Sequence, residues 1–145
     1  MPANRYCGLD EDERQDAVAV RDAARPERVT TTAQELVAAA KQQINEIGVD
    51  KAKQLLAEGD ITVVDVREES EYAAGHLDKA LPIPRGTLEF KVGTTPELAD
   101  KSKSVLVYCR TGGRAAMAAQ TLQSLGYLNV LSIAGGYEAW QKASS

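Results

Sequence analysis

The sequence contains few of the residues on which disulfide-bonded or zinc-binding proteins depend. Its 145 residues include two cysteines and one histidine. At most one disulfide could form, so a secreted scaffold held together by disulfides is excluded. Two cysteines and one histidine also cannot supply the four ligands of an ordinary structural zinc site. We therefore expect a domain that folds around a hydrophobic core, with no metal and no cofactor.

Long apolar runs and an excess of positive charge are also missing. No stretch is long and apolar enough to span a bilayer, and the first residues, MPANRYCGLD, lack the apolar segment of a signal peptide. The 17 basic and 21 acidic residues give a formal net charge of -4, which disfavours nucleic acid as a partner. These absences predict a cytoplasmic protein that binds neither membranes nor nucleic acids.

The chain divides into a charged N-terminal segment and a regularly patterned remainder. Residues 1–30 carry seven acidic residues and five arginines but few large apolar side chains, which predicts a flexible or loosely helical tail. Residues 31–145 contain no internal repeat and no linker rich in glycine, serine or proline. We expect these residues to form one domain.

Helical and strand patterns alternate from residue 31 onward. Thr32 and Glu35 form a capping-box pattern that predicts a helix at about 32–43, and Asp50 is expected to cap a second helix. Apolar and β-branched runs predict strands at 44–48, 61–66, 80–84, 103–109 and 129–133. Helical patterns also occur at 68–76, 115–125 and 135–143. This alternation predicts an α/β fold with parallel βαβ units and helices on both faces of the sheet.

The segment VLVYCRTGGRAAMAAQTL predicts a strand, a short loop and a helix, with Cys109 at the start of the loop. In an open parallel sheet, ligands bind at the carboxyl ends of strands, where the N-termini of the following helices also lie. Gly112 and Gly113 allow the backbone to curl so that successive N–H groups face one centre. Arg110 and Arg114 add two positive charges near the helix N-terminus. All of these features favour the thiolate form of Cys109.

A thiolate that is surrounded by N–H groups, with no base beside it, can attack a soft electrophile whose leaving group is already an anion. The same N–H groups could then hold a persulfide, a phosphate or an arsenate. The alternative is a structural cysteine that ends a buried strand before a tight turn, which is a common role for cysteine. The glycine pair, the two arginines and the position between strand and helix favour the reactive role.

Three motifs resemble those of the rhodanese family of sulfurtransferases in order and spacing: VDVREESEYAAGHLDKALPIP, CRTGGRA and GGYEAW. The resemblance covers about residues 44–142. It implies a rhodanese-like fold over 31–145, in which a five-stranded, mostly parallel sheet has helices on both faces. It also implies that Cys109 takes a sulfane sulfur from a donor such as thiosulfate and passes it, as a persulfide, to cyanide or a thiol. The loop that holds the persulfide would consist of Arg110, Thr111, Gly112, Gly113 and Arg114.

The resemblance assigns supporting roles to residues outside the loop. Asp65 and Arg67 are expected to hold the loop and a neighbouring turn together rather than to contact the substrate. His76 lies in the matched motif before a strand and is expected to be structural. The glycine pair 135–136 is expected to let the last helix turn near the site, and Trp140 to pack in the core.

Residues 85–90, RGTLEF, have two interpretations: Leu88 and Phe90 line the rim of a pocket, or the segment is a plain surface turn. Cys7 is expected to be a bystander in the tail, although a cysteine on a flexible segment could reach a persulfide. The expected partners are a small-molecule sulfur donor and acceptor, or a protein thiol. The sequence leaves the oligomeric state open.

Two other functions remain as alternatives. The first is a dual-specificity or tyrosine-type phosphatase. The same fold occurs in dual-specificity phosphatases with a longer loop, Cys-x5-Arg, whereas Cys109 to Arg114 is Cys-x4-Arg. Tyr108 precedes the cysteine, where tyrosine phosphatases typically have histidine. The second alternative is a persulfide carrier or binding module for a partner protein. The loop CRTGGR is compatible with thiosulfate, a mercaptan or a protein persulfide as the donor.

Overall fold

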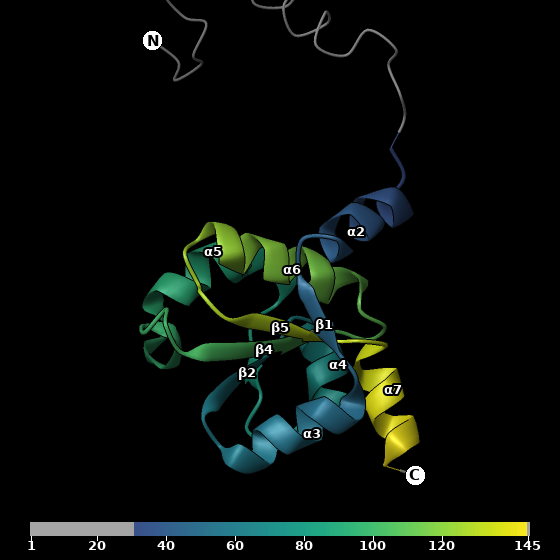
Figure 1. Ribbon diagram of the computed structural model, residues 1–145, viewed down its shortest axis with the longest axis vertical. Helices are drawn as coiled ribbons and strands as arrows, with labels where there is room; N and C mark the ends of the chain where they lie inside the picture. Colours follow the sequence, from purple (N-terminus) through teal and green to yellow (C-terminus); the bar gives the residue numbers. More distant parts are fainter. Residues whose placement is uncertain (1–30, 145) are drawn as a thin grey trace, which may run out of the picture. The chain divides into compact units, whose positions relative to one another are not determined.

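Five parallel strands form the centre of the structure, a computed structural model that describes residues 31–144 (Figure 1). Their order in the sheet is β1-β5-β4-β2-β3, and every pairing is parallel. The strands are β1 (Asn45–Ile47), β2 (Ile61–Asp65), β3 (Leu81–Pro82), β4 (Ser104–Tyr108) and β5 (Val130–Ile133). This confirms the predicted α/β fold with a five-stranded sheet. The expectations for residues 1–30, including Cys7, lie outside the described residues.

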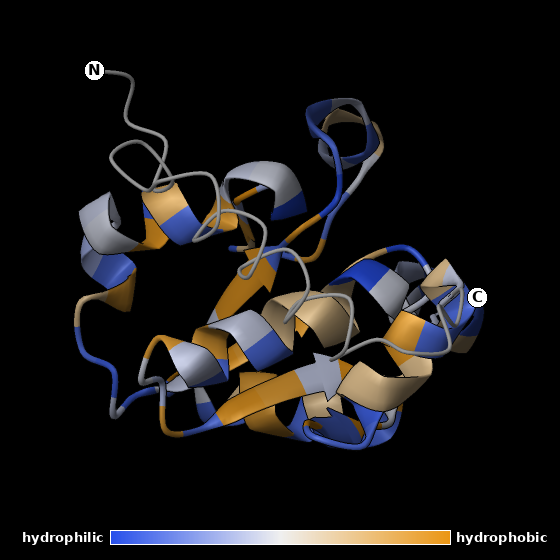
Figure 2. Ribbon diagram, turned by 90° about the horizontal axis from the view of Figure 1, so that it is seen from above, coloured by the Kyte–Doolittle hydropathy of each residue, from blue (hydrophilic) through white to orange (hydrophobic). Residues whose placement is uncertain are grey.

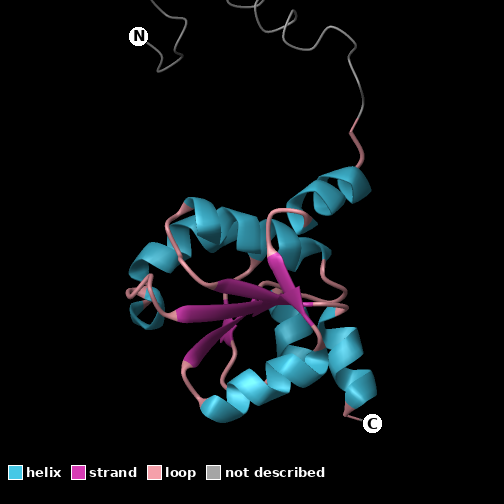
Figure 3. Cartoon of the chain, viewed as in Figure 1, coloured by secondary structure: helices cyan, strands magenta, loops and turns pink. Residues whose placement is uncertain are grey.

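Helices cover both faces of the sheet (Figures 1 and 3). One face carries α2 (Ala33–Lys41), α5 (Leu88–Lys91) and α6 (Gly113–Ser124). The other face carries α3 (Val49–Glu58), α4 (Glu69–Ala74) and α7 (Gly136–Ala143). Three short 3-10 turns complete the connection from β3 to β4: η1 (Arg85–Thr87), η2 (Val92–Thr94) and η3 (Pro96–Leu98). None of the helices within residues 31–144 has the length and apolar character needed to cross a membrane.

The core has two parts because successive side chains of a strand point to opposite faces of the sheet. Val64 packs in the cluster beneath α6, whereas its neighbour Val63 packs in the cluster beneath α3 and α7. Strands β2, β4 and β5 are accordingly hydrophobic along most of their length, and orange segments of strand are visible in Figure 2. The sheet-facing side of α6 is made of small residues, all fully buried: Ala115, Ala116, Ala118 and Ala119. These alanines let α6 lie close to the sheet and fix the position of its N-terminus.

Three local predictions differ from the structure. Helix α3 begins at Val49 with Gly48 at its N-cap, so Asp50 lies within the first turn, where its charge still favours the helix dipole. Helix α6 begins at Gly113, two residues earlier than predicted, because Gly112 already supplies the turn that starts it. Leu88 is fully buried in the core and does not line a pocket rim, whereas Phe90 is 80% exposed. Leu88 therefore packs in the apolar cluster beneath α6.

Candidate active site

Cys109 lies directly after β4, at the carboxyl edge of the sheet, and its side chain is held inside a tight loop. The Gly112 N–H donates a hydrogen bond of 3.0 Å to Cys109 Sγ. This contact requires the loop to reverse within three residues, and Gly112 does so with a left-handed φ of 115°. The thiol is buried, with 1% of the residue exposed. The loop thus directs a backbone donor, the Gly112 N–H, at the sulfur.

The N-terminus of α7 holds the outer side of this loop. The Tyr137 N–H donates to the Cys109 carbonyl at 2.8 Å, and the Glu138 N–H donates to the Arg110 carbonyl at 3.1 Å. Gly136, with a φ of 62°, makes this approach possible: a Cβ atom there would lie 2.6 Å from the carbonyl oxygens of Cys109 and Arg110. Helix α7 thus binds two carbonyl groups of the loop, while the Gly112 N–H of the same loop binds the sulfur.

Both arginines of the loop are paired with glutamates. Arg110 donates from Nε to Glu138 at 2.9 Å, and this pair is largely exposed. Arg114 makes a two-point contact with Glu71, at 2.7 and 3.0 Å. Each of these two positive charges is therefore partly offset by a carboxylate from outside the loop: Glu138 lies in the motif GGYEAW, and Glu71 lies in the motif that begins at Val64. Backbone N–H groups at the start of α6 add to the positive potential at Cys109.

The Arg114–Glu71 pair shifts the protonation equilibria of both partners. The hydrogen bond from Arg114 lowers the pKa of Glu71 to about 2. The same hydrogen bond raises the pKa of Arg114, and the nearby Cys109 adds to this effect. Arg114 and Glu71 are therefore both charged over a wide pH range, and they connect α6 to α4 at the end of the loop.

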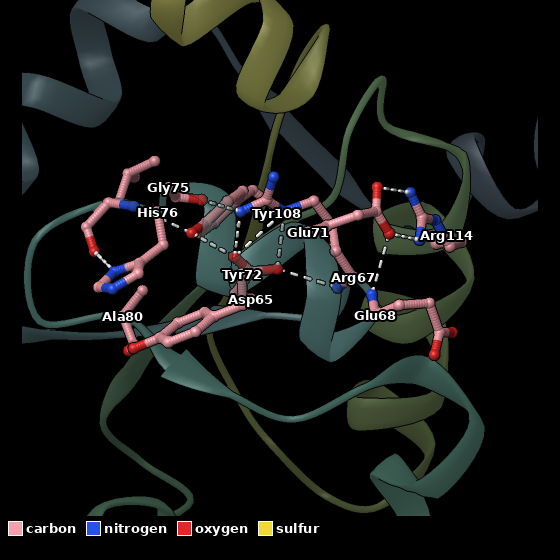
Figure 4. A network of polar contacts seen from close by, with 11 residues as sticks. Asp65, Arg67, Glu68, Glu71, Tyr72, Gly75, His76, Ala80, Tyr108 and Arg114 are labelled. Atoms are coloured by element: carbon pink, nitrogen blue, oxygen red, sulfur yellow. Dashed lines mark hydrogen bonds and ion pairs between the residues drawn. The ribbon is translucent and has the colours of Figure 1, made fainter.

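A buried polar network lies under the loop (Figure 4). Arg67 contacts Asp65 through two nitrogens, at 2.7 Å from Nη2 and 3.0 Å from Nε, and it also donates to the Gly75 carbonyl at 2.6 Å. The Tyr108 hydroxyl donates to Asp65 at 2.6 Å and accepts from the Leu77 N–H at 3.0 Å. These contacts join β2, β4 and the turn after α4. Asp65 and Arg67 thus connect the strand that precedes Cys109 to the turn after α4.

Burial and hydrogen bonding also set the ionisation of this network. Burial, reinforced by the hydrogen bond with Asp65, raises the pKa of Tyr108, so the hydroxyl stays protonated. Burial alone would lower the pKa of Arg67, but its hydrogen bonds to Asp65 raise it above the usual value. The network therefore combines one ion pair with a neutral donor, and all three side chains have partners.

A cavity of about 370 Å³ lies beside the loop, between α4 and the first turns of α7. Its lining includes members of both arginine–glutamate pairs: Arg67, Glu71, Ala74, Gly75, Arg110, Tyr137, Glu138 and Gln141. A larger cavity of about 440 Å³ includes Trp140 and lies near the beginnings of β2 and β4, away from Cys109. The smaller cavity is the one that a reactant of Cys109 could use, because Arg110 belongs to both the loop and its wall.

His76 lies outside the loop and is exposed. Its ring stacks on Tyr72 at 3.8 Å between centroids, and Nδ1 lies 2.8 Å from the Leu77 carbonyl oxygen. The loop residue Thr111 is also exposed, and Trp140 is half-buried against the cluster beneath α7. Within residues 31–144 no three metal-ligating side chains lie close enough together to bind a metal ion.

The structure adds residues to the site that the motifs did not single out. Glu71 and Glu138 are 43 and 28 residues from the arginines they bind, so no local pattern joins them. Tyr108 was noted only as the residue before the cysteine. A signal was available for it, because a polar hydroxyl at the end of a fully buried strand needs a hydrogen-bond partner.

The fold and the loop together define an open α/β protein in which a backbone N–H donates to a buried cysteine at the carboxyl edge of the sheet. Residues 48–143 match the family described as rhodanese-like domain, and the chain belongs to this family. A sulfurtransferase of Allochromatium vinosum is 34% identical over 100 residues, which cover 68% of this chain and 90% of the relative. The thiosulfate sulfurtransferase GlpE of Coxiella burnetii is 36% identical over 91 residues, or 63% of this chain and 81% of the relative. Both of these relatives are thus named as sulfurtransferases.

Solved structures show the same fold. The human single-domain sulfurtransferase has a TM-score of 0.65 and 29% identity, covering 69% of this chain and 97% of that one. A Rhodopseudomonas palustris protein of unknown function, described as a "possible tyrosine phosphatase", has a TM-score of 0.74 and 28% identity. That match covers 81% of this chain and 94% of the other.

Proposed function

We propose that this protein is a sulfurtransferase in which Cys109 carries a sulfane sulfur, as a persulfide, from a donor such as thiosulfate to cyanide or a thiol. One observation carries the proposal: the Gly112 N–H donates to Cys109 Sγ at 3.0 Å, inside a loop that ends at Arg114. A donor aimed at sulfur stabilises an anion there. The persulfide is such an anion, one atom further from the backbone.

In the loading step the Cys109 thiolate attacks the outer sulfur of thiosulfate. A bond forms between the two sulfurs, the sulfur–sulfur bond within thiosulfate breaks, and sulfite leaves with its electron pair. No proton moves, so the step needs no general base beside the cysteine. The backbone donors of the loop hold the negative charge, which is now on the outer sulfur.

In the discharge step cyanide or a thiolate attacks the outer sulfur of the persulfide. With cyanide, a carbon–sulfur bond forms, the persulfide bond breaks, and thiocyanate leaves while the Cys109 thiolate is regenerated. The exposed Arg110–Glu138 pair borders the approach to the loop. Exposed pairs of this kind are weak, so Arg110 can turn from Glu138 to an anionic reactant at little cost.

The hydrogen bonds between Arg114 and Glu71 disfavour a phosphatase reaction. A phosphate on Cys109 has three outer oxygens that need donors, and an arginine at the end of the loop would have to supply two of them. Here both terminal nitrogens of Arg114 are bound to Glu71. The six-residue loop from Cys109 to Arg114 also encloses less space than a phosphate requires. A persulfide carrier that serves a protein partner uses the same chemistry and differs in its acceptor.

The proposal is tested by loading the protein with thiosulfate in a Cys7→Ser background and measuring its mass. A gain of one sulfur atom on the peptide that contains Cys109 is expected, and its loss on adding cyanide should yield thiocyanate. Initial rates at several acceptor concentrations should give parallel lines, as a double displacement requires. No mass gain with thiosulfate, mercaptan or persulfide donors would contradict the proposal.

The phosphatase alternative is tested with the same protein. Hydrolysis of aryl phosphates should not exceed that of the Cys109→Ser variant. Turnover of aryl phosphates that depends on Cys109 would favour phosphatase over sulfurtransferase.

A further inference from the structure

The residues before the family match lie against the candidate active loop. Helix α2 and strand β1 precede residue 48, where the match begins. A Cβ atom on Gly113 would lie 3.5 Å from Val37 of α2. Ala40 and Ile44 are both buried in the core cluster beneath α6. The packing of α2 therefore fixes the side chains at its C-terminal end beside the loop.

Two charged side chains reach the loop from this segment. Lys41 Nζ and Glu46 Oε2 each lie 3.8 Å from the position that a Cβ atom on Gly112 would occupy. Gly112 is the residue whose N–H binds Cys109 Sγ at 3.0 Å. Together with ordinary bond lengths, these distances place Nζ within about 9 Å of the sulfur. This is comparable to the Debye length of about 10 Å at 0.1 M salt, so the ammonium group is not fully screened from the sulfur.

The ion pair that holds Lys41 is the loosest of those described around the loop. Its nitrogen–oxygen distance is 3.5 Å, and the two side chains are 37% and 27% exposed. The pairs made by Arg67, Arg110 and Arg114 have distances of 2.7, 2.9 and 2.7 Å. Lysine also has a flexible stem and freely rotating donors, whereas the two-point contacts of Arg67 and Arg114 fix their orientation. Lys41 can therefore exchange Glu46 for an anion more readily than Arg67 or Arg114 can exchange its carboxylate.

From this geometry we infer that Lys41 is a specificity-determining residue, which favours anionic over neutral reactants at Cys109 while Glu46 sets its resting position. The inference rests on the proposed function, because it takes Cys109 as the nucleophile. It assigns a role at the site to a helix that lies outside the residues matched to the family. Lys41 acts through its charge, so a neutral side chain of similar length should not replace it.

The test compares alkylation of Cys109 by iodoacetate, which is anionic, and by iodoacetamide, which is neutral. Rates are measured on the Cys109 peptide in a Cys7→Ser background, at one pH and low salt. Lys41→Met should lower the iodoacetate-to-iodoacetamide rate ratio about two- to fivefold, as expected for one charge at this distance. Lys41→Arg should keep the ratio, and Glu46→Gln should raise it. In about 1 M salt the differences should disappear.

Lys51→Gln is the matched control, because Lys51 is an exposed lysine on α3, which covers the other face of the sheet. Its ratio should equal that of the parent protein. A purely structural role for Lys41 would change both rates together and leave the ratio unaltered, which would overturn the inference. Equal rate ratios in Lys41→Met and Lys51→Gln would also overturn the inference.

The two proposals fail in different ways. Alkylation needs a reactive thiolate but no sulfur transfer, so a changed ratio without persulfide formation would support the inference and contradict the proposed function. Persulfide formation with an unchanged ratio would do the reverse. A Cys109 that neither reagent modifies would overturn both. With thiosulfate as substrate, Lys41→Met should raise KM more than it lowers kcat.

Discussion

Gly136 has no side chain, and this allows the first turn of α7 to contact the candidate active loop. Its φ is 62°, and a Cβ atom would lie 2.6 Å from three backbone atoms of Cys109 and Arg110. Backbone atoms in a loop that is bound on both sides cannot move aside cheaply. A substitution here must displace either the loop or α7.

We predict that Gly136→Ala lowers both stability and Cys109 reactivity. The left-handed φ and the close contacts together should reduce the free energy of unfolding by about 2–4 kcal/mol. Urea unfolding and the rate of Cys109 alkylation by iodoacetamide measure the two effects. Gly86→Ala is the control, since a Cβ atom there meets nothing within 4 Å. An unchanged alkylation rate in Gly136→Ala would show that α7 does not position the loop.

The hydroxyl of Tyr108 is the second residue-scale feature with a measurable effect. Removing it leaves the Leu77 N–H without an acceptor and Asp65 with one donor fewer, in a fully buried site. Tyr108→Phe should therefore reduce the free energy of unfolding by about 1–3 kcal/mol. Tyr137→Phe is a suitable comparison, because that ring also lies against Arg67, at 4.4 Å, and its hydroxyl is not part of the network in Figure 4. If urea unfolding shows the same loss of unfolding free energy in Tyr108→Phe and Tyr137→Phe, the prediction is wrong.

At the scale of elements, the Glu71–Arg114 pair joins α4 to the helix that carries the loop. The pKa of Glu71 is lowered to about 2 in the folded protein, from 4.5. A lowered pKa in the folded state stabilises the protein above the unfolded value, and this contribution is lost as the pH falls from about 4.5 toward 2. Part of the acid sensitivity of the fold should therefore come from this one carboxylate.

We predict that Glu71→Gln flattens the dependence of stability on pH in this window. The difference in unfolding free energy between pH 6 and pH 3 should shrink by up to about 1 kcal/mol, since solvent screens a partly exposed pair. Urea unfolding at the two pH values measures it. Glu69→Gln, a change on the same helix, should leave the difference unaltered. An identical pH dependence in Glu71→Gln and the parent would contradict the prediction.

The elements themselves were largely predictable from the sequence, whereas their partners were not. Runs such as ITVVD and SVLVY are apolar on both faces and form β2 and β4 where predicted. The glycine-rich loop also revealed the backbone donor to Cys109. The glutamates that bind Arg110 and Arg114 come from α7 and α4, and only the folded arrangement brings them together. Both interpretations of residues 85–90 left Leu88 at the surface, but it is buried. A segment this short has no periodic pattern that shows which side chains face the core.

At the scale of the whole molecule, residues 33–145 group as one compact unit, whereas the family match begins at 48. We predict that a chain starting at Thr31 keeps the thermal midpoint and the Cys109 reactivity of the parent. A chain starting at Gly48 should unfold at a lower temperature, because it loses two core side chains, Ala40 and Ile44, and the strand that pairs with β5. Calorimetry distinguishes the two. Equal midpoints for both shortened chains would show that α2 and β1 add nothing to the fold.

The pairing of β1 with β5 also determines when the protein can be completed during its synthesis. Asn45 pairs with Leu131, so β1 leaves the ribosome before the strand with which it pairs. The contacts from Tyr137 and Glu138 to the loop form later still. A nascent chain that already contains Cys109 thus lacks the framework that holds the loop. The loop should therefore hold the Cys109 side chain in place only after residue 138 has left the ribosome and can pack against it.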